Sequence, residues 1–93
     1  MDKGHRLEIE YCTQCRWMLR AAWVAQELMT SFESDLAEVA MIPGKGGIFE
    51  VRIDGEIIWS LRIEGRFAQP KELKKRLRDK VDPGRKLGHT DRV

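Results

Sequence analysis

The sequence has few of the features that define several large protein classes. Its 93 residues include two cysteines, two histidines and three prolines. No apolar run approaches the roughly 18 residues that a transmembrane helix needs. Residues 1–6 are charged and lack the apolar segment and small-residue cleavage site of a secretory signal. A chain this short buries only about 60% of its unfolded surface, which disfavours a large substrate cavity. These absences predict a small cytoplasmic protein with no membrane partner.

Both cysteines lie in one CxxC motif, Cys12 to Cys15, so they cannot link distant parts of the fold as the disulfides of secreted scaffolds do. A zinc site would need two further thiol or imidazole donors. The two histidines, His5 and His89, lie near the ends of the chain without paired spacing. The chain also lacks a Walker loop, a Rossmann fingerprint and a Ser-His-Asp set. We therefore expect no metal, no cofactor, and neither nucleotide-dependent nor hydrolytic catalysis.

Hydrophobic periodicity predicts the first half of the fold. Residues 7–11 alternate between apolar and acidic side chains, as in a strand with one wet face, and this strand ends at the CxxC. Residues 16–33 predict a helix whose apolar arc faces the core. That arc consists of Trp17, Met18, Ala21, Ala22, Val24, Ala25, Leu28, Met29 and Phe32. Residues 35–42 are β-prone, and the proline and glycines after them predict a loop.

The second half predicts a hairpin, a helix and a tail. Residues 49–53 and 57–63 alternate between apolar and polar side chains around an Asp-Gly pair, which favours a two-residue hairpin turn. A proline opens the helix predicted over 70–81, where apolar residues recur at four-residue spacing. Residues 83–93 have no apparent apolar face to pack, so we expect a flexible tail after one domain over 1–82.

The predicted order is β-α-β-β-β-α. The first two strands flank a helix and should run parallel through a right-handed crossover, whereas the hairpin is antiparallel. The sheet is therefore four-stranded and mixed. Three of its strands carry charged residues at alternate positions, so one sheet face should be polar and both helices should cover the other. This is an α/β fold of minimal thioredoxin-like plan.

The CxxC stands between a predicted strand and a predicted helix, where redox chemistry has a physical basis. We expect Cys12 to cap the helix, so that unpaired N–H groups and the helix dipole stabilise its thiolate. Cys15, one helical turn later, would resolve a mixed disulfide formed on Cys12. The alternatives are a zinc half-site shared between chains, or two cysteines with no special role. The order of strand, CxxC and helix favours redox activity over both.

Two surfaces could bind partners. Leu19 and Trp23 fall on the otherwise polar arc of the first helix, beside the motif, and could contact a protein or form a homodimer through this helix. The alternative is that a loop or the tail covers them. Residues 71–93 hold nine Lys and Arg against four Asp and Glu. No aromatic residue is interleaved with the charges of 71–80, so we interpret them as a solvated helix face and expect no nucleic-acid partner.

Several segments together resemble a known family. The similarity lies in Tyr11-Cys12-Thr13-Gln14-Cys15, the Arg-Trp-Met-Leu-Arg-Ala-Ala-Trp helix after it, Gly47-Ile48-Phe49-Glu50-Val51, Asp54-Gly55 and Gly65-Arg66-Phe67. The chain is similar here to the selenoprotein W, T and H group of Rdx-type thioredoxin-like proteins, in its bacterial all-cysteine form. The resemblance covers about residues 7–80. It implies a thioredoxin-like fold, reversible disulfide chemistry between Cys12 and Cys15, and a role in cell redox homeostasis that could be linked to glutathione.

Two points about the family bear on the site. Its selenocysteine-bearing members carry selenium at the position of Cys15, so the roles of the two cysteines could be inverted. The thioredoxins proper have a cis-proline before their third strand, where this chain has glycines. A glycine loop beside the CxxC could let a peptide or glutathione backbone approach closely, or it could be a plain turn. The predicted site residues are the catalytic pair Cys12 and Cys15, with substrate contacts at Thr13, Gln14, Gly46, Gly47 and Ile48.

The sequence leaves more than one function open. The first hypothesis is a thiol–disulfide oxidoreductase whose partner is a protein or glutathione. The second is a non-enzymatic redox-sensing adaptor, in which oxidation of the cysteine pair changes the surface around Leu19 and Trp23. A structural zinc or dimerisation module is the third. Whether the chain turns over a substrate or only senses redox state is not decided by these residues.

Overall fold

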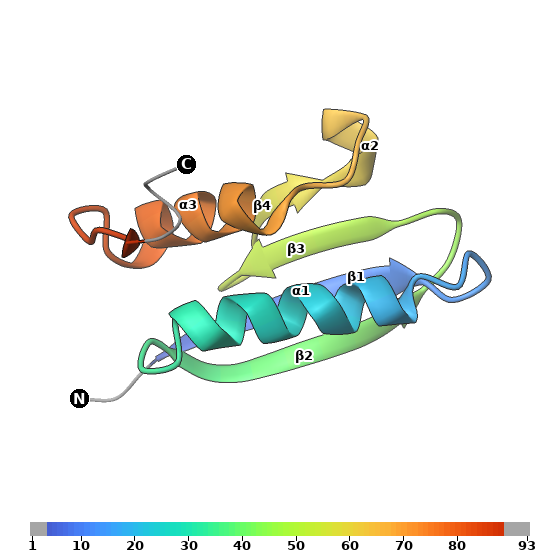
Figure 1. Ribbon diagram of the computed structural model, residues 1–93. Helices are drawn as coiled ribbons and strands as arrows, with labels where there is room; N and C mark the ends of the chain where they lie inside the picture. The colour runs from blue at the N-terminus through green and yellow to red at the C-terminus, as the bar shows by residue number, and fades with distance from the viewer. Residues whose placement is uncertain (1–3, 89–93) are drawn as a thin grey trace.

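A four-stranded mixed sheet forms one layer of the protein in a computed structural model, which describes residues 4–88 (Figure 1). The strands are β1 His5–Cys12, β2 Leu36–Gly44, β3 Phe49–Ile53 and β4 Glu56–Ser60. Their order across the sheet is β2-β1-β3-β4. β1 and β2 run parallel, and β3 pairs antiparallel with both β1 and β4. The predicted mixed sheet is confirmed.

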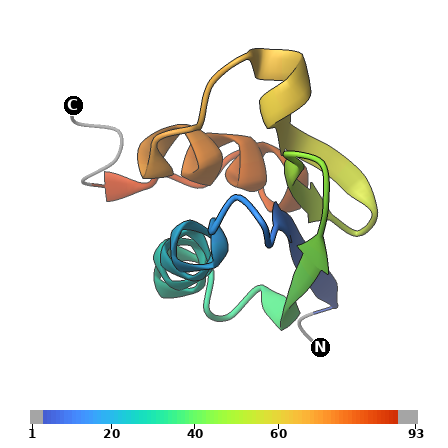
Figure 2. The same cartoon turned by 90° about the vertical axis from the view of Figure 1, so that its right-hand side faces the viewer.

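Two longer helices cover one face of this sheet. α1, Met18–Ser31, connects β1 to β2, and α3, Pro70–Val81, follows the hairpin. Figure 2 shows both helices on the same side of the strands. The fully buried side chains between the layers include Leu7, Ile9, Val51, Leu28 and Leu77. Burial of each contributes about 2 kcal/mol of transfer free energy, so the core is what joins the two layers. No helix within 4–88 has both the length and the apolar character to cross a membrane.

The opposite face of the sheet carries ion pairs between neighbouring strands. Arg52 of β3 contacts the carboxylates of Glu8 at 3.0 Å, Glu10 at 3.1 Å and Glu50 at 2.8 Å. Arg6 also donates to Glu8 at 2.9 Å. These hydrogen bonds, first from Arg6 and then from Arg52, lower the pKa of Glu8. The alternating charges in the sequence therefore mark the polar face, as predicted.

The structure corrects the strand predicted over 57–63. β4 ends at Ser60, and a short helix, α2, Leu61–Glu64, follows it. Gly65 ends this helix in the left-handed conformation, with φ of 79°. Ile63, which alternation would have placed in the sheet, is 72% exposed. The sequence predicted one strand because a four-residue helix is too short to show a helical period.

A register irregularity explains why alternation also fails within β4. The pairing of β3 with β4 shifts between Val51 and Arg52. Because such a bulge changes which residue faces inward, Ile58 and Trp59 are both buried while Ile57 is exposed. The alternation predicted from Ile57 onward was therefore wrong at its first position.

The residues after α3 fold back against the core. Leu87 is 9% exposed and belongs to the core cluster. Arg85 forms a two-pronged pair with the carboxylate of Asp35, at 2.6 and 2.8 Å, and these hydrogen bonds lower the Asp35 pKa. The prediction for 83–93 overlooked Leu87 as an apolar side chain that could pack. Residues 89–93, His89 among them, lie outside the described residues, and the flexibility of the tail stays a prediction.

Candidate functional site

The CxxC forms a turn between β1 and α1. Cys12 is the last residue of β1, and its sulfur is bonded to that of Cys15 in a disulfide with a Cα–Cα distance of 5.3 Å. The backbone N–H of Cys15 donates to Cys12 Sγ at 3.3 Å. α1 begins only at Met18, with Trp17 in the N-cap position. The predictions that Cys12 caps the helix and that Cys15 lies one helical turn later were therefore wrong.

A tight turn separates the motif from the helix. The backbone N–H of Arg16 donates to the carbonyl of Thr13 at 3.0 Å, and Arg16 has a φ of 63°. This left-handed conformation is uncommon for a residue with a Cβ. It prevents the helix from starting at the second cysteine. The N–H of Trp17 then donates to the carbonyl of Cys12 at 3.4 Å, which closes the turn.

The turn is anchored to the loop between β2 and β3. The N–H of Cys12 donates to the carbonyl of Ile48 at 2.9 Å. The N–H and the hydroxyl of Thr13 both donate to the carbonyl of Gly44, at 3.1 and 3.3 Å. Figure 1 shows the turn and the loop at the same end of the molecule. The structure thus brings together Ile48, Gly46 and Gly47 with the CxxC; their contact with a substrate stays a prediction.

Gly44 is a structural residue of this site that the sequence prediction missed. A Cβ at this position would lie 2.7 Å from Ile48 Cγ2 and 2.9 Å from Glu10 Oε2. Glycine is needed here because the strand passes close to two side chains. By contrast, Gly46 and Gly47 have open space around them and positive φ values of 70° and 78°. The glycine cluster in the sequence was the available signal, but it did not show which glycine is packed.

The two cysteine side chains differ in burial. Cys12 is 1% exposed, whereas Cys15 is partly exposed and stands beside the exposed residues Thr13 and Gln14. A partner in solution can therefore reach the sulfur of Cys15 more readily than that of Cys12. This geometry opposes the expectation that Cys12 is the better-placed nucleophile, and it agrees with the inverted assignment.

Aromatic side chains pack together beside the turn, where Trp17 follows the CxxC. Trp17 packs edge-to-face against Phe67 with a centroid distance of 5.0 Å, and Phe67 packs in the same way against Phe49 at 5.3 Å. The guanidinium of Arg20 stacks over the Phe67 ring at 4.1 Å. Arg20 is itself exposed, so this stacking lies at the surface. The base of the turn is therefore well packed although its tip is exposed.

An apolar patch lies beside the motif on α1. We define the α1 patch as Met18, Leu19 and Trp23, which are 52%, 76% and 44% exposed. The loop and tail considered as possible covers do not bury them within residues 4–88. The sequence left open whether Leu19 and Trp23 are exposed or covered, and it wrongly placed Met18 on the core-facing arc of a helix predicted over 16–33. The later start leaves Met18 in the first turn, open to solvent.

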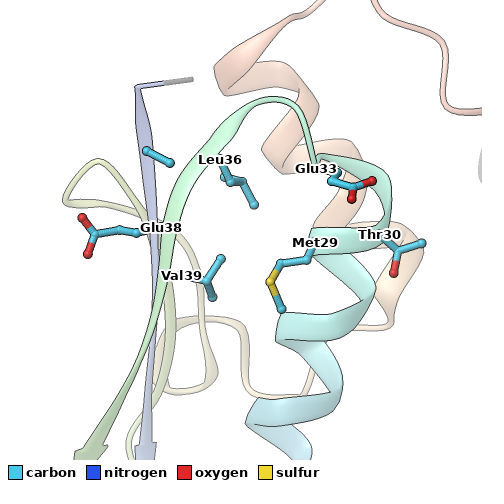
Figure 3. Close-up of a pocket in the computed structure, with 7 residues that line it drawn as sticks. Met29, Thr30, Glu33, Leu36, Glu38 and Val39 are labelled. Atoms are coloured by element: carbon cyan, nitrogen blue, oxygen red, sulfur yellow. The ribbon is translucent and has the colours of Figure 1, made fainter. Parts of the chain in front are cut away.

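One cavity lies away from the cysteines, at the other end of α1. It measures about 430 Å³ and lies between the end of α1 and the start of β2 (Figure 3). Met29 of α1 points toward Val39 and Leu36 of β2 in this space, while Glu38 points away. Met29, predicted in the core, is 40% exposed here. The helical rise places Met29 about 16 Å along α1 from Met18, so this groove is not part of the CxxC site.

The histidine of the described chain and the motif lie apart. Within the described part of the chain, no group of three His, Cys, Asp or Glu side chains is placed to hold a metal ion. His5 pairs with Asp54 at 2.7 Å, at the far end of β1 from the cysteines.

The fold and the site together define a class of protein. A β-α-β unit, an antiparallel hairpin and a closing helix carry a CxxC between the first strand and the first helix. This is the thioredoxin-like fold, and the CxxC occupies its first strand-to-helix connection.

Residues 6–79 match the sequence profile of the Rdx family, and the chain belongs to that family. Two crystal structures are similar. A protein from Bordetella parapertussis is 49% identical with a TM-score of 0.81; the match covers 83% of this chain and 98% of that one. A selenoprotein W-related protein from Vibrio cholerae is 46% identical with a TM-score of 0.82, over 84% and 98% of the two chains. A search of curated proteins found no match. The resemblance inferred from the motifs is confirmed.

Proposed function

We propose that the protein is a thiol–disulfide redox protein that works through Cys12 and Cys15, in the redox homeostasis of the cytoplasm. The observation that carries this proposal is the disulfide itself, which joins a buried and a partly exposed cysteine at the end of β1. The exposed sulfur can meet a partner, and the buried one is placed to displace it. Membership of the Rdx family supports the same chemistry.

The reduced protein would act in two exchange steps. The Cys15 thiolate attacks one sulfur of a partner disulfide, a mixed disulfide forms, and one partner thiolate leaves. The Cys12 thiolate then attacks Cys15 Sγ, the Cys12–Cys15 bond forms, and the second partner thiolate leaves. Each leaving thiolate takes a proton from solvent. The protein loses two electrons and the partner gains them, so a cellular thiol such as glutathione is needed to restore the dithiol.

Two features favour Cys15 as the attacking thiolate. It is the more exposed sulfur, and it is nearer in the chain to the N-terminus of α1, whose dipole stabilises an anion. Cys12 suits the second step because its Sγ accepts the Cys15 N–H. A charge-assisted hydrogen bond of this kind stabilises a buried thiolate.

Single-cysteine variants test this function. Cys12→Ser keeps only Cys15, and Cys15→Ser keeps only Cys12, so the two form a matched pair. We expect Cys12→Ser to form a mixed disulfide with hydroxyethyl disulfide about tenfold faster than Cys15→Ser. Mass spectrometry of the adduct over time measures the two rates. Equal rates would reject the assignment of Cys15. If neither cysteine of the reduced wild type reacted faster than a model thiol below about pH 8, the redox function itself would be rejected.

A second candidate, the redox-sensing adaptor, is supported by the α1 patch. Leu19 is 76% exposed, and α1 starts three residues after Cys15. Opening the disulfide would free the turn that fixes this end of the helix. The adaptor hypothesis predicts that reduction changes amide hydrogen exchange in the first turn of α1 and alters self-association in sedimentation, and that Trp23→Ala removes the second effect. The same exchange and sedimentation in both redox states would reject it.

A further inference from the structure

A second cavity borders the loop that anchors the CxxC. It measures about 250 Å³ and lies between the loop residues Lys45 to Ile48 and the junction of β4 with α2, Ser60 to Arg62. The loop leaves β2 at Gly44, which accepts hydrogen bonds from Thr13, and it ends at Ile48, which accepts one from Cys12. One wall of the cavity is therefore fixed directly to the redox turn.

Ser60 provides an unsatisfied group in the opposite wall. The residue is 1% exposed, and within 4–88 its hydroxyl is the one buried side-chain polar group without a hydrogen-bond partner. It occupies the N-cap position of α2, yet its side chain makes no capping hydrogen bond there. Burial of a hydroxyl without a partner is unfavourable. Ser60 lines the cavity, so rotation about its Cα–Cβ bond can present the hydroxyl to a ligand oxygen there.

The same cavity has two cationic side chains that the protein does not neutralise. Lys45 and Arg62 are exposed, and neither forms an ion pair with any residue in 4–88. Glu50 also lines the cavity, but its carboxylate already accepts a hydrogen bond from Arg52 at 2.8 Å. The wall thus offers two free cations and a hydroxyl, together with one carboxylate that is already paired.

We propose that this cavity binds a carboxylate of the disulfide partner and so gives the CxxC a preference for carboxylate-bearing disulfides. The proposal rests on the redox function proposed above. A carboxylate carries one charge and can accept from an ammonium, a guanidinium and a hydroxyl together. A dianionic phosphate would be repelled more strongly by Glu50. The carboxylate could belong to a small thiol such as glutathione or to an acidic peptide segment.

The rate at which three simple disulfides oxidise the reduced protein tests this preference. Dithiodipropionate carries a carboxylate on each half, hydroxyethyl disulfide is neutral, and cystamine is cationic. In Lys45→Gln/Arg62→Gln we expect the rate with dithiodipropionate to fall about fivefold, the effect of two partly exposed charge contacts. The rate with hydroxyethyl disulfide should stay within about twofold of wild type, since that disulfide offers no charge to the cavity. Cystamine should react no slower.

A matched control separates the cavity from net charge. Lys75→Gln/Lys86→Gln removes the same two charges from exposed side chains that form no ion pair within 4–88. It should leave all three rates unchanged. An equal loss in this control would overturn the proposal, because a general electrostatic attraction would then explain the preference.

Ser60→Ala tests the contribution of the hydroxyl independently of the two cations. We expect a loss of about twofold with dithiodipropionate, from one hydrogen bond to a partly solvated ligand, and no change with hydroxyethyl disulfide. If Ser60→Ala only raises the melting temperature, and Lys45→Gln/Arg62→Gln leaves the dithiodipropionate rate unchanged, the cavity proposal is wrong. A wild type inert to hydroxyethyl disulfide as well would contradict the redox function.

Two further substrates distinguish the two sources of the carboxylate: glutathione disulfide, and a disulfide-linked peptide with a Glu beside its cysteine. The source is the substrate whose rate falls in Lys45→Gln/Arg62→Gln.

Discussion

The two ends of the sheet differ in how their polar groups are satisfied. At the end where β1 begins, charged groups are paired across the fold: His5 lies 2.7 Å from Asp54, the N–H of Arg6 donates to the same carboxylate at 2.8 Å, and Asp35 holds Arg85 with two hydrogen bonds. These contacts tie the sheet, the hairpin turn and the segment after α3 together.

At the CxxC end, several groups have no such partner. Arg16, Lys45 and Arg62 form no ion pair with residues 4–88, and the hydroxyl of Ser60 is buried without a hydrogen bond. Leu19 is exposed at the same end. The exposed cations are hydrated, but a buried hydroxyl without a partner is unfavourable for stability, and native proteins keep such groups mainly at functional sites. The contrast separates an end that stabilises the fold from an end that is available for binding.

Gly44→Ala is expected to give the largest effect, because it disturbs the CxxC end through packing. The new Cβ would lie 2.7 Å from Ile48 Cγ2, which forces the loop away from the strand. We expect the free energy of unfolding to fall by about 2 to 3 kcal/mol, as for an overpacked site. Denaturant titration of the oxidised protein measures it.

Gly46→Ala is the control for Gly44→Ala. It has no neighbour within 4 Å, but its φ of 70° strains any residue with a Cβ. We expect a loss of only about 1 kcal/mol. If the two substitutions cost the same, packing at Gly44 is not what holds the loop to the motif.

Asp35→Asn, at the end of the sheet where β1 begins, should lower the free energy of unfolding by less than Gly44→Ala does. Its carboxylate is 18% exposed and accepts two hydrogen bonds from Arg85, so we expect a loss of about 1 to 2 kcal/mol at neutral pH. Hydrogen bonds from Arg85 lower the Asp35 pKa in the folded state. A carboxyl with a lowered folded pKa stabilises the fold above its unfolded pKa, about 3.9, and this contribution is lost as the pH falls through the folded pKa.

The difference in melting temperature between wild type and Asp35→Asn should therefore be largest above about pH 5 and shrink in acid. Asp79→Asn is the matched control, because Asp79 is exposed and within 4–88 pairs only with its neighbour Arg78, at 3.4 Å. It should change stability by less than about 0.5 kcal/mol. A difference for Asp35→Asn that stayed constant from neutral pH through the acid range would show that the pair does not act through its charge.

The sequence predicts the sheet well because its pattern repeats over whole elements. Alternation in β1 and β3 indicates the buried and polar faces, and the charges at Glu8 and Arg52 mark the polar one. It fails at β4, where one irregular pairing between Val51 and Arg52 reverses the alternation. A bulge depends on contacts with the neighbouring strand, and one sequence does not show them.

The site is predicted in composition but not in geometry. The helical period left open whether Leu19 and Trp23 are exposed or covered, but the CxxC and the glycine loop could be inferred from motif and spacing. The delayed start of α1 could not, because it depends on Arg16 adopting a left-handed backbone. That single conformation moves the helix N-terminus away from Cys12 and, with the burial of Cys12, changes which cysteine we expect to attack.

A substitution in the α1 patch should change stability least, and it tests whether the CxxC end of the sheet is free for binding. Leu19 is 76% exposed, so Leu19→Ser should change the free energy of unfolding by less than about 0.5 kcal/mol. Its rate of reaction with hydroxyethyl disulfide should equal that of wild type, because no sulfur contact is altered. A partner protein that docks on the patch would still bind less well, since the substitution removes apolar area from the interface. If instead Leu19→Ser lowered stability by more than about 1 kcal/mol, the side chain would be part of the folded core, and this end of the molecule would not be free for binding.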